Sequence, residues 1–337
     1  MKLEAIYRPV KRDLQRVEER METIIVSEIK PILDSYKYIL SSGGKRLRPA
    51  LVLLSAKCLA YDSPMVIDVA CAIELVHTAS LIHDDIVDSA DLRRGKPSAH
   101  VVWGTEIAVT IGDYLFSRAV EILAAYEDFK AIRTLSQAVK RMAEGELLET
   151  VNRGNMELTE ADYINIIHGK TAALMWASCK LVAEIASVRE SYIMALSQYG
   201  LNFGISYQIV DDLLDLLSTD SKLGKPTGNG LREGNLSLPL IHILQNGNED
   251  FKEQLIWTLS RGSISDTKLR EVADIVNNSG ARSYTQSIAE NYAGKAKNAL
   301  AIIEDSPAKQ CLLSFADFVV NRRLAEISHQ STEISMS

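Results

Sequence analysis

The stretch "MVIDVACAIELVHTASLIHDDIVD", Met65–Asp88, decides the fold. Over residues 65–83 its apolar side chains surround the predicted helix on most sides. A helix at the surface of a globular protein has a single apolar stripe, whereas a helix that is apolar all round belongs in a core. Ile193–Leu217 is a second helix of this kind, interrupted by Gly200 and Gly204. The sequence therefore predicts a helical core.

The rest of the chain shows helical periodicity almost everywhere and alternating strand patterns almost nowhere. An amphipathic helix is expected from Leu14 to Pro31, and Thr159–Asp162 resembles a capping box that begins another helix. No stretch is long or biased enough to be an interdomain linker, and no repeat of fixed period is found. We predict a single all-α domain over residues 1–337.

Composition limits the kinds of function. Hydrophobic residues make up 47% and charged residues 24% of the 337, as in a globular protein with a large core. The formal net charge of −7 argues against nucleic acid as the main partner but allows a small anionic substrate in a basic pocket. The 4 cysteines form no CxxC pair, Met1–Arg20 is charged throughout, and the uncharged stretch Tyr192–Val210 is too polar to cross a bilayer. We expect a cytoplasmic protein without a transmembrane segment.

Two clusters of aspartates follow the two apolar helices with the same spacing. They are Asp84, Asp85 and Asp88, and Asp211, Asp212 and Asp215. Carboxylates four residues apart share one helix face and repel each other, and a helix carboxyl end is already negative. Oxygen ligands without histidine or cysteine are typical of Mg²⁺, which also binds phosphates. The sequence predicts that both clusters face one cavity, where Mg²⁺ ions hold a diphosphate.

Basic residues accompany both acidic clusters. They are Lys45, Arg46 and Arg48 at the start of a helix, Arg93 and Arg94 after the first cluster, Lys170 in an apolar helix, and Lys222 and Lys225 after the second cluster. The amino end of a helix favours an anion, and a lysine among apolar residues needs a partner or a function. We therefore expect a second phosphate-binding pocket.

Five motifs in a fixed order carry a resemblance to a known family. They are GGKRLRP (43–49), HDDIVD with LRRG (83–95), GKT (169–171), YQIVDDLLD (207–215) and LGKPTG (223–228). The chain resembles the trans-polyprenyl diphosphate synthases over nearly its whole length. The resemblance implies a large bundle of mostly antiparallel helices around a deep central cavity, as in isoprenoid synthases, and a homodimer. It also implies the condensation of an allylic diphosphate with isopentenyl diphosphate.

The same resemblance assigns roles to individual residues. Asp84, Asp88 and Asp211 would bind the Mg²⁺ ions that hold the allylic diphosphate, while Asp85, Asp212 and Asp215 would complete the two acidic rims. Arg93, Lys170 and Lys225 would hold the same diphosphate as it leaves. Lys45, Arg48, His77 and Arg94 would form the isopentenyl diphosphate pocket, and Thr171 and Gln208 would line the reaction centre.

Product length is expected to depend on the helix positions before Asp84. In short-chain members of the family an aromatic residue four or five positions earlier blocks the product tunnel. This chain has Ala79 and Ser80 there, and both are small. We expect a long-chain product of about C30 to C50, because the tail has room to continue along the helix. A shorter-chain synthase of the same family, making about C15 to C20, is the alternative.

Three other functions are weighed against this one. Many family members have Asp at position 230 and Lys at position 235, where this chain has Gly230 and Asn235. That departure favours the catalytic subunit of a heteromeric synthase. His83 and Asp84 could also belong to an HD-type metal phosphohydrolase, but the second aspartate cluster would then be unexplained. A helical protein that only binds a ligand would have no use for either cluster.

Overall fold

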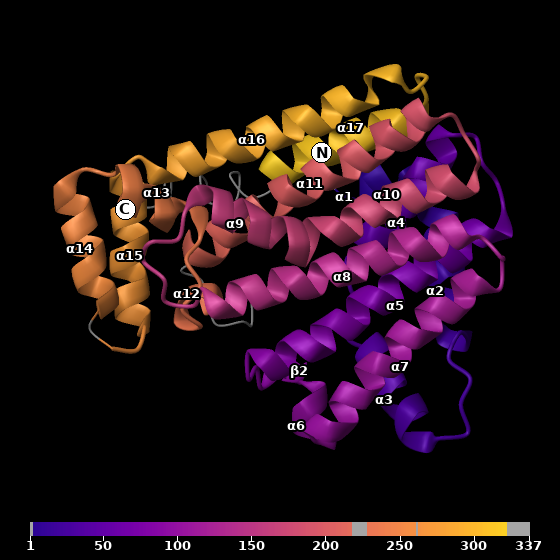
Figure 1. Ribbon diagram of the computed structural model, residues 1–337, viewed down its shortest axis with the longest axis horizontal. Coiled ribbons are helices and arrows are strands. Elements are labelled where there is room, and N and C mark those ends of the chain that lie inside the picture. The colour runs from indigo at the N-terminus through magenta and orange to yellow at the C-terminus, as the bar shows by residue number, and fades with distance from the viewer. Residues whose placement is uncertain (1–2, 218–227, 261, 322–337) are drawn as a thin grey trace, which may run out of the picture. The chain divides into compact units, whose positions relative to one another are not determined.

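The computed structural model describes residues 3–217, 228–260 and 262–321. The chain divides into two compact units (Figure 1). The first unit comprises residues 1–140, 174–200 and 299–313, and the second comprises residues 141–173, 201–298 and 314–337.

The first unit is helical apart from one short hairpin. Its elements are α1 (Leu3–Tyr7), η1 (Arg8–Val10), α2 (Lys11–Thr23), α3 (Lys30–Leu40), α4 (Leu47–Cys58), α5 (Pro64–Val87), β1 (Leu92–Arg93), β2 (Lys96–Pro97), α6 (Ala99–Trp103), α7 (Thr105–Ala124), α10 (Ala173–Ile185) and η4 (Leu300–Ile302), together with parts of α8 (Phe129–Val151), α11 (Glu190–Leu217) and α17 (Pro307–Asn321).

Helix α5 is the core helix that its apolar sequence predicts. Ser63 caps it, since its hydroxyl accepts a hydrogen bond from the backbone N–H of Met65, and Pro64 occupies its first turn. Ile73 and Leu75 are completely buried. The helix packs against α2, α4 and α7, and α5 and α7 lie side by side in Figure 1. The first aspartate cluster is therefore attached to a core helix of this unit.

Helix α5 is also long and apolar enough to span a membrane, the one such helix among the described residues. In its most apolar window, 78% of the residues are buried inside the protein. A core helix of a soluble protein has the same length and composition, so this observation is weak evidence for a membrane. The absence of a transmembrane segment stays a prediction.

The amphipathic helix expected from Leu14 to Pro31 is shorter than predicted. Helix α2 ends at Thr23, and Pro31 lies in the first turn of the next helix, α3. The three residues after Thr23 are Ile24, Ile25 and Val26, whose β-branched side chains lower helix propensity. Ile24 and Ile25 are buried although they lie outside a helix. These residues continue the apolar pattern of α2 because they are buried, although the helix has already ended.

The second unit is built from helices alone in its described part. They are α9 (Glu160–Ile167), η2 (His168–Ala172), α12 (Asn229–Arg232), α13 (Leu238–Asn246), α14 (Glu249–Ser260), α15 (Asp266–Asn278) and α16 (Ala281–Ala299, whose last residue is assigned to the first unit), together with the ends of α8, α11 and α17.

Two local features of this unit position the site. Helix α9 begins at the predicted capping box, in which Thr159 and Asp162 bind each other's backbone N–H groups. The segment η2 that follows is a π-helical turn, a rare conformation that is frequent at functional sites. Helix α11 is as buried as predicted, with Phe203 and Ile209 completely inside. The all-α fold class is confirmed.

Candidate active site

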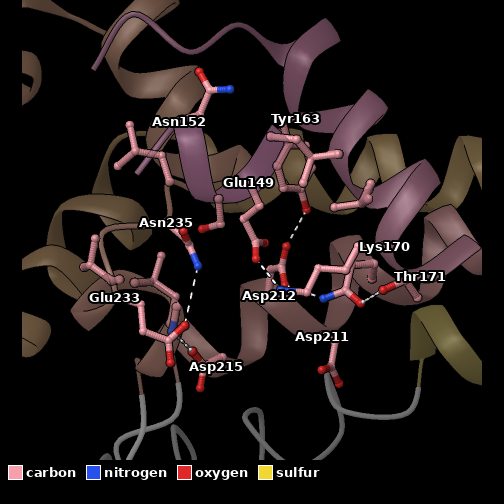
Figure 2. Close-up of a pocket in the computed structure, with 18 of the residues that line it drawn as sticks. Glu149, Asn152, Tyr163, Lys170, Thr171, Asp211, Asp212, Asp215, Glu233 and Asn235 are labelled. Carbon is pink, nitrogen blue, oxygen red and sulfur yellow. Dashed lines mark hydrogen bonds and ion pairs between the residues drawn. The ribbon is translucent and has the colours of Figure 1, made fainter. Parts of the chain in front are cut away.

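A cavity of about 260 Å³ lies within the second unit, between α8, α9, η2, α11 and residues 230–237 (Figure 2). Its polar lining consists of Glu149, Asn152, Tyr163, Lys170, Thr171, Gln208, Asp211, Asp212, Asp215, Glu233, Asn235 and Ser237. Six of these residues were predicted as site residues from two separate motifs. The structure therefore brings the GKT motif and the second aspartate cluster to one cavity.

Asp212 is held at the cavity wall by two hydrogen-bond donors. The Tyr163 hydroxyl donates to Asp212 Oδ2 at 2.7 Å, and Gln208 Nε2 donates to Asp212 Oδ1 at 2.6 Å. Thr171 Oγ1 donates in turn to Gln208 Oε1 at 2.7 Å. These bonds form a continuous chain from Thr171 to Tyr163 (Figure 2). Thr171 and Gln208 are thus adjacent, as their predicted shared role requires.

Neighbouring carboxylates add to the effect of burial on Asp212. Burial raises the pKa of Asp212 to about 7, and the charges of Asp211 and Glu149 add to this rise, while its two hydrogen-bond donors oppose it. Burial and the neighbouring Asp212 also raise the pKa of Tyr163 well above its ordinary value. Crowded carboxylates of this kind are stabilised by a bound cation.

Asp215 binds the chain that follows the second cluster. Its Oδ1 accepts the backbone N–H of Gly228 at 3.2 Å, and its Oδ2 accepts the backbone N–H of Gly230 at 3.3 Å. Burial raises the pKa of Asp215, and these two N–H groups lower it again. A Cβ atom at Gly230 would meet only Asp215 Oδ2, at 4.0 Å. A side chain at position 230 would therefore begin beside the Asp215 carboxylate.

Lys170 has carboxylate partners rather than the apolar surroundings expected from its sequence neighbours. Its Nζ lies 2.9 Å from Glu146 Oε2 and also contacts Glu149 Oε2. Both glutamates come from α8, which the prediction did not consider. Lys170 is also in the π-helical turn η2 and not in a regular α-helix. A lysine among apolar residues was expected to need a partner or a function, and the two glutamates are partners that lie far away in the sequence.

The first aspartate cluster lies in the first unit, at the carboxyl end of α5. Asp85 is only 4% exposed, and Arg93 Nε donates to its Oδ1 at 2.7 Å. Burial raises the pKa of Asp85, and the positive charge of Arg93 opposes the rise. Asp84 and Asp88 are half-buried and one helical turn apart. Asp85 thus anchors Arg93, while Asp84 and Asp88 share another face of the helix.

The predicted isopentenyl diphosphate residues gather around the start of α4. Arg94 begins the tight turn of the β1–β2 hairpin, with a positive φ of 52°, and its guanidinium donates to the carbonyl oxygen of Gly43. If residue 44 had a Cβ atom, the Nη1 atoms of Arg46 and Arg94 would each lie 3.1 Å from it. Both guanidinium groups are therefore next to Gly44.

Several arginines act on the charge of His77. Burial lowers the pKa of His77 well below its ordinary value, and the positive charges of Arg48, Arg94, Arg93 and Arg46 lower it further. Arginines gather at this density where an anion binds between them. That His77, Arg48 and Arg94 share one anionic ligand stays a prediction.

Arg46 differs from its neighbours in the GGKRLRP motif because its side chain points to structural partners. Its Nη1 donates to Glu74 Oε1 at 2.7 Å, and its Nη2 donates to Glu18 Oε2 at 3.0 Å. Its φ of 51° lies in the left-handed region, which is strained for a residue with a side chain. Glu74 is a buried residue of α5. The two ion pairs therefore hold the loop that carries Lys45 and Arg48.

We expect Glu74→Ala to lower the free energy of unfolding by about 3 to 5 kcal/mol, because it leaves the buried Arg46 charge without its buried partner. Urea denaturation of the purified protein measures this change. Glu18→Ala is the matched control: its carboxylate is 45% exposed, so its loss is expected to cost about 1 kcal/mol or less. Equal losses in the two variants would contradict the structural role given to Glu74.

The structure does not assign a role to some of the predicted site residues. Lys225, like Lys222, lies outside the described residues. Ala79 is completely buried in α5 and Ser80 is half-buried, so their effect on product length stays a prediction. Within the described part of the chain, no three or more histidine, cysteine, aspartate or glutamate side chains form a group able to hold a metal ion. Mg²⁺ binding by the two aspartate clusters also stays a prediction.

Comparison with known proteins decides the family. The model of the polyprenyl synthetase family matches residues 29–276. The chain belongs to this family. It is similar to the octaprenyl diphosphate synthase of Escherichia coli strain K12, with 33% identity over 96% of this chain and 99% of the relative. It is 36% identical to the short chain isoprenyl diphosphate synthase of Methanothermobacter thermautotrophicus, over 91% of this chain and 96% of the relative.

A solved structure agrees over the same length. The polyprenyl synthase of Caulobacter crescentus CB15, complexed with calcium and isoprenyl diphosphate, superposes with a TM-score of 0.87 and 35% identity, over 96% of this chain and 98% of that chain. This polyprenyl synthetase is therefore a prenyltransferase with the all-α fold of isoprenoid synthases, as the five motifs predicted. The phosphohydrolase and the ligand-binding alternatives were wrong.

Three residues in or beside the polyprenyl synthetase cavity were missed by the sequence analysis. They are Glu146 and Glu149 on α8 and Tyr163 on α9. The two glutamates are three residues apart in "GELLET", which places them on one helix face. That spacing was a usable signal, but α8 carries charges on several sides and the sequence does not say which of them point inward.

Proposed function

We propose that this chain condenses an allylic diphosphate with isopentenyl diphosphate and releases an all-trans polyprenyl diphosphate of about C30 to C50. One observation carries the proposal. The cavity of the second unit is lined by Asp211, Asp215, Lys170 and the Thr171–Gln208 pair, which combine metal ligands, a cation and hydroxyl and amide groups. Such a set suits a diphosphate that leaves a carbon atom.

The donor set supports Mg²⁺ as the metal. Asp84 and Asp88 in one unit and Asp211 and Asp215 in the other offer only carboxylate oxygens. Mg²⁺ is usually bound by one or two carboxylates together with water and substrate phosphates, so a site without three protein ligands in one place fits it. When bound, Mg²⁺ offsets the negative charge that develops on the leaving diphosphate. That both clusters act on the same diphosphate stays a prediction.

The residues of the chain then have the following tasks. Lys170 and Arg93 bind oxygen atoms of the leaving diphosphate, and Lys225 is expected to do the same. The C–O bond of the allylic substrate breaks, and the oxygens of Thr171 and Gln208, which share a hydrogen bond, are expected to stabilise the carbon cation. The double bond of isopentenyl diphosphate attacks this cation, and a proton leaves the new intermediate to the released diphosphate. Apolar helices must exclude water, which would otherwise quench the cation to an alcohol.

The basic cluster of the first unit supports binding of the second substrate. Arg48, His77 and Arg94 lie together at the start of α4, and the exposed Lys45 belongs to the same loop. The C–O bond of isopentenyl diphosphate does not break in the reaction, so no charge develops on a leaving group. Its pocket therefore needs cations but no metal. This arrangement distinguishes the pocket from the two aspartate clusters.

Product length, oligomeric state and location complete the proposal. Relatives of both long-chain and short-chain type match the chain at similar identity, so their names alone do not set the length. The small side chains of Ala79 and Ser80 favour the long product. We further propose a homodimer that acts in the cytoplasm.

The test is an assay of the purified chain alone with farnesyl diphosphate, labelled isopentenyl diphosphate and Mg²⁺, with products identified by mass spectrometry. We expect a polyprenyl diphosphate of about C30 to C50, no product in the presence of EDTA, and recovery when Mg²⁺ is added in excess. The same assay is repeated with a geranyl and a geranylgeranyl primer. Activity that needs a second protein would instead support the heteromeric alternative, and products of about C15 to C20 would support the short-chain one.

A further inference from the structure

We propose that Glu149 is a counter-ion that competes with the diphosphate for Lys170 and so weakens the binding of the allylic substrate. The inference rests on the proposed function, since it concerns the ammonium group that would bind the leaving diphosphate. Lys170 carries one positive charge and contacts more than one negative charge. Two carboxylates, Glu146 and Glu149, contact one ammonium group. Lys170 is therefore more than neutralised before an anion arrives.

The backbone fixes these three side chains close together. A Cβ atom at Gly145 would lie 2.4 Å from the backbone nitrogen of Lys170, and one at Gly169 would lie 2.7 Å from the carbonyl oxygen of Arg141. Helix α8 and the π-helical turn η2 are thus in direct backbone contact. Glu146 and Glu149, three residues apart on α8, meet Lys170 on the same side. Both glutamates therefore reach Lys170 from a helix whose backbone touches the segment that carries the lysine.

The two glutamates have different positions with respect to the cavity. Glu149 is part of the cavity lining and Glu146 is not. In Figure 2 a dashed line joins the Glu149 carboxylate to the Lys170 ammonium group. The charge of Glu149 also raises the pKa of both Asp212 and Tyr163, so its negative field extends across the cavity wall. Glu146 is therefore the permanent partner of Lys170, and Glu149 is the partner that an incoming diphosphate must displace or face.

The charge of the cavity makes this competition costly. Among the described residues, the acidic and basic side chains that line the cavity are Glu149, Asp211, Asp212, Asp215 and Glu233 against Lys170. Metal ions are expected at the aspartates, but Glu149 contacts the ammonium and not an aspartate. A carboxylate and a phosphate oxygen that approach the same ammonium repel each other, and this repulsion is strong where water is scarce. Loss of the charge at position 149 should therefore strengthen diphosphate binding.

The decisive variant is Glu149→Gln, which keeps the size of the side chain and removes its charge. We expect the KM for farnesyl diphosphate to fall about fivefold to tenfold, and the KM for isopentenyl diphosphate to stay within about twofold, because a repulsion between two charges is removed. The Kd of Mg²⁺ with inorganic pyrophosphate, measured by calorimetry, should fall to a similar extent. The melting temperature should stay unchanged, since Lys170 keeps Glu146.

Three further variants separate this role from a general effect of charge or folding. Glu144→Gln removes a charge from the same helix, where Glu144 pairs with Arg141, and should leave both KM values unchanged. Glu233→Gln removes a charge from the cavity lining near Asn235 and should lower the KM for farnesyl diphosphate less than Glu149→Gln does. Glu146→Gln with Glu149→Gln leaves Lys170 without either carboxylate and should raise this KM, because the ammonium is no longer positioned.

An unchanged or higher KM for farnesyl diphosphate in Glu149→Gln would overturn the proposal, and so would an equal fall in Glu233→Gln. Failure of the proposed function looks different: the unchanged protein would then make no polyprenyl product from any primer. The pyrophosphate titration does not depend on turnover, so it tests the competition at Lys170 in either case.

Discussion

Replacing Asp211 by asparagine is expected to lower the turnover number about 10³-fold, with a much smaller change in the melting temperature. Asp211 lines the cavity from α11, and asparagine has the same shape without the negative charge that binds a metal ion. The measurement is the initial rate with saturating farnesyl diphosphate and isopentenyl diphosphate over a range of Mg²⁺ concentrations. The Mg²⁺ concentration for half-maximal rate should rise in the variant.

Asp212→Asn is the matched comparison, because the structure gives its neighbour a different environment. Both Asp212 oxygens already accept hydrogen bonds, from Tyr163 and from Gln208. We expect this variant to lose about tenfold in rate, mainly through the orientation of Gln208 and Thr171. Tyr163→Phe, which removes one of the two donors, should resemble it. Equal losses in Asp211→Asn and Asp212→Asn would contradict this division of roles.

A double variant tests whether the two aspartate clusters act together. If Asp84 and Asp211 hold the same diphosphate, Asp84→Asn with Asp211→Asn should lose much less activity than the product of the two single losses, because residues that act as a unit are not additive. If the activity lost by the double variant equals the product of the two single losses, the clusters act on different groups. This kinetic result addresses the central prediction drawn from the sequence.

The helical core was predictable because its signal is local. Met65–His83 and Ile193–Leu217 carry apolar side chains on most sides, and this alone predicts that they are buried, whatever helices pack around them. Both segments are buried helices in the structure. The end of α2 was less predictable. Ile24 and Ile25 continue the apolar spacing of the helix, but they are buried in a non-helical segment. Periodicity reports which residues are buried and not which backbone conformation buries them.

The site was predictable where charged residues occupy positions that an apolar helix and its negative carboxyl end disfavour. The second aspartate cluster at the end of an apolar helix had no structural reason to be there, and three of its residues line the cavity. Glu149 and Tyr163 gave no such signal, because a glutamate on a charged helix and a tyrosine after a capping box are ordinary. Their role depends on contact with Lys170 and Asp212, which are distant in the sequence. Sequence patterns do not contain such contacts.

The GGKRLRP motif shows the same limit at the level of single residues. Lys45, Arg46 and Arg48 are equally basic and all lie at the start of α4. Only the structure shows that Arg46 turns to Glu18 and Glu74 and stabilises the loop. A motif therefore predicts the chemistry of a segment better than the task of each side chain in it.

Replacing Ala79 by phenylalanine is expected to shorten the product from about C30 to C50 to about C15 to C20. Ala79 lies five residues before Asp84 on α5, a distance of little more than one helical turn. If the growing tail passes along this helix, an aromatic ring at position 79 closes its path near the diphosphate. Mass spectrometry of the products, after removal of the diphosphate, measures the length distribution directly.

The controls separate a blocked tunnel from a damaged fold. Ala79 is completely buried, so a larger side chain is expected to cost about 1 to 3 kcal/mol of stability whatever it faces. Ala79→Ser adds little volume, and its hydroxyl can bond a carbonyl one turn earlier, as Ser178 does to Leu174. It should keep the long product. Ser80→Phe is the second test, since Ser80 is half-buried and one turn before Asp84. Destabilisation lowers the yield of all products together, whereas a blocked tunnel changes their ratio. An unchanged ratio in Ala79→Phe would therefore show that Ala79 does not line the tunnel, even if the variant is less stable.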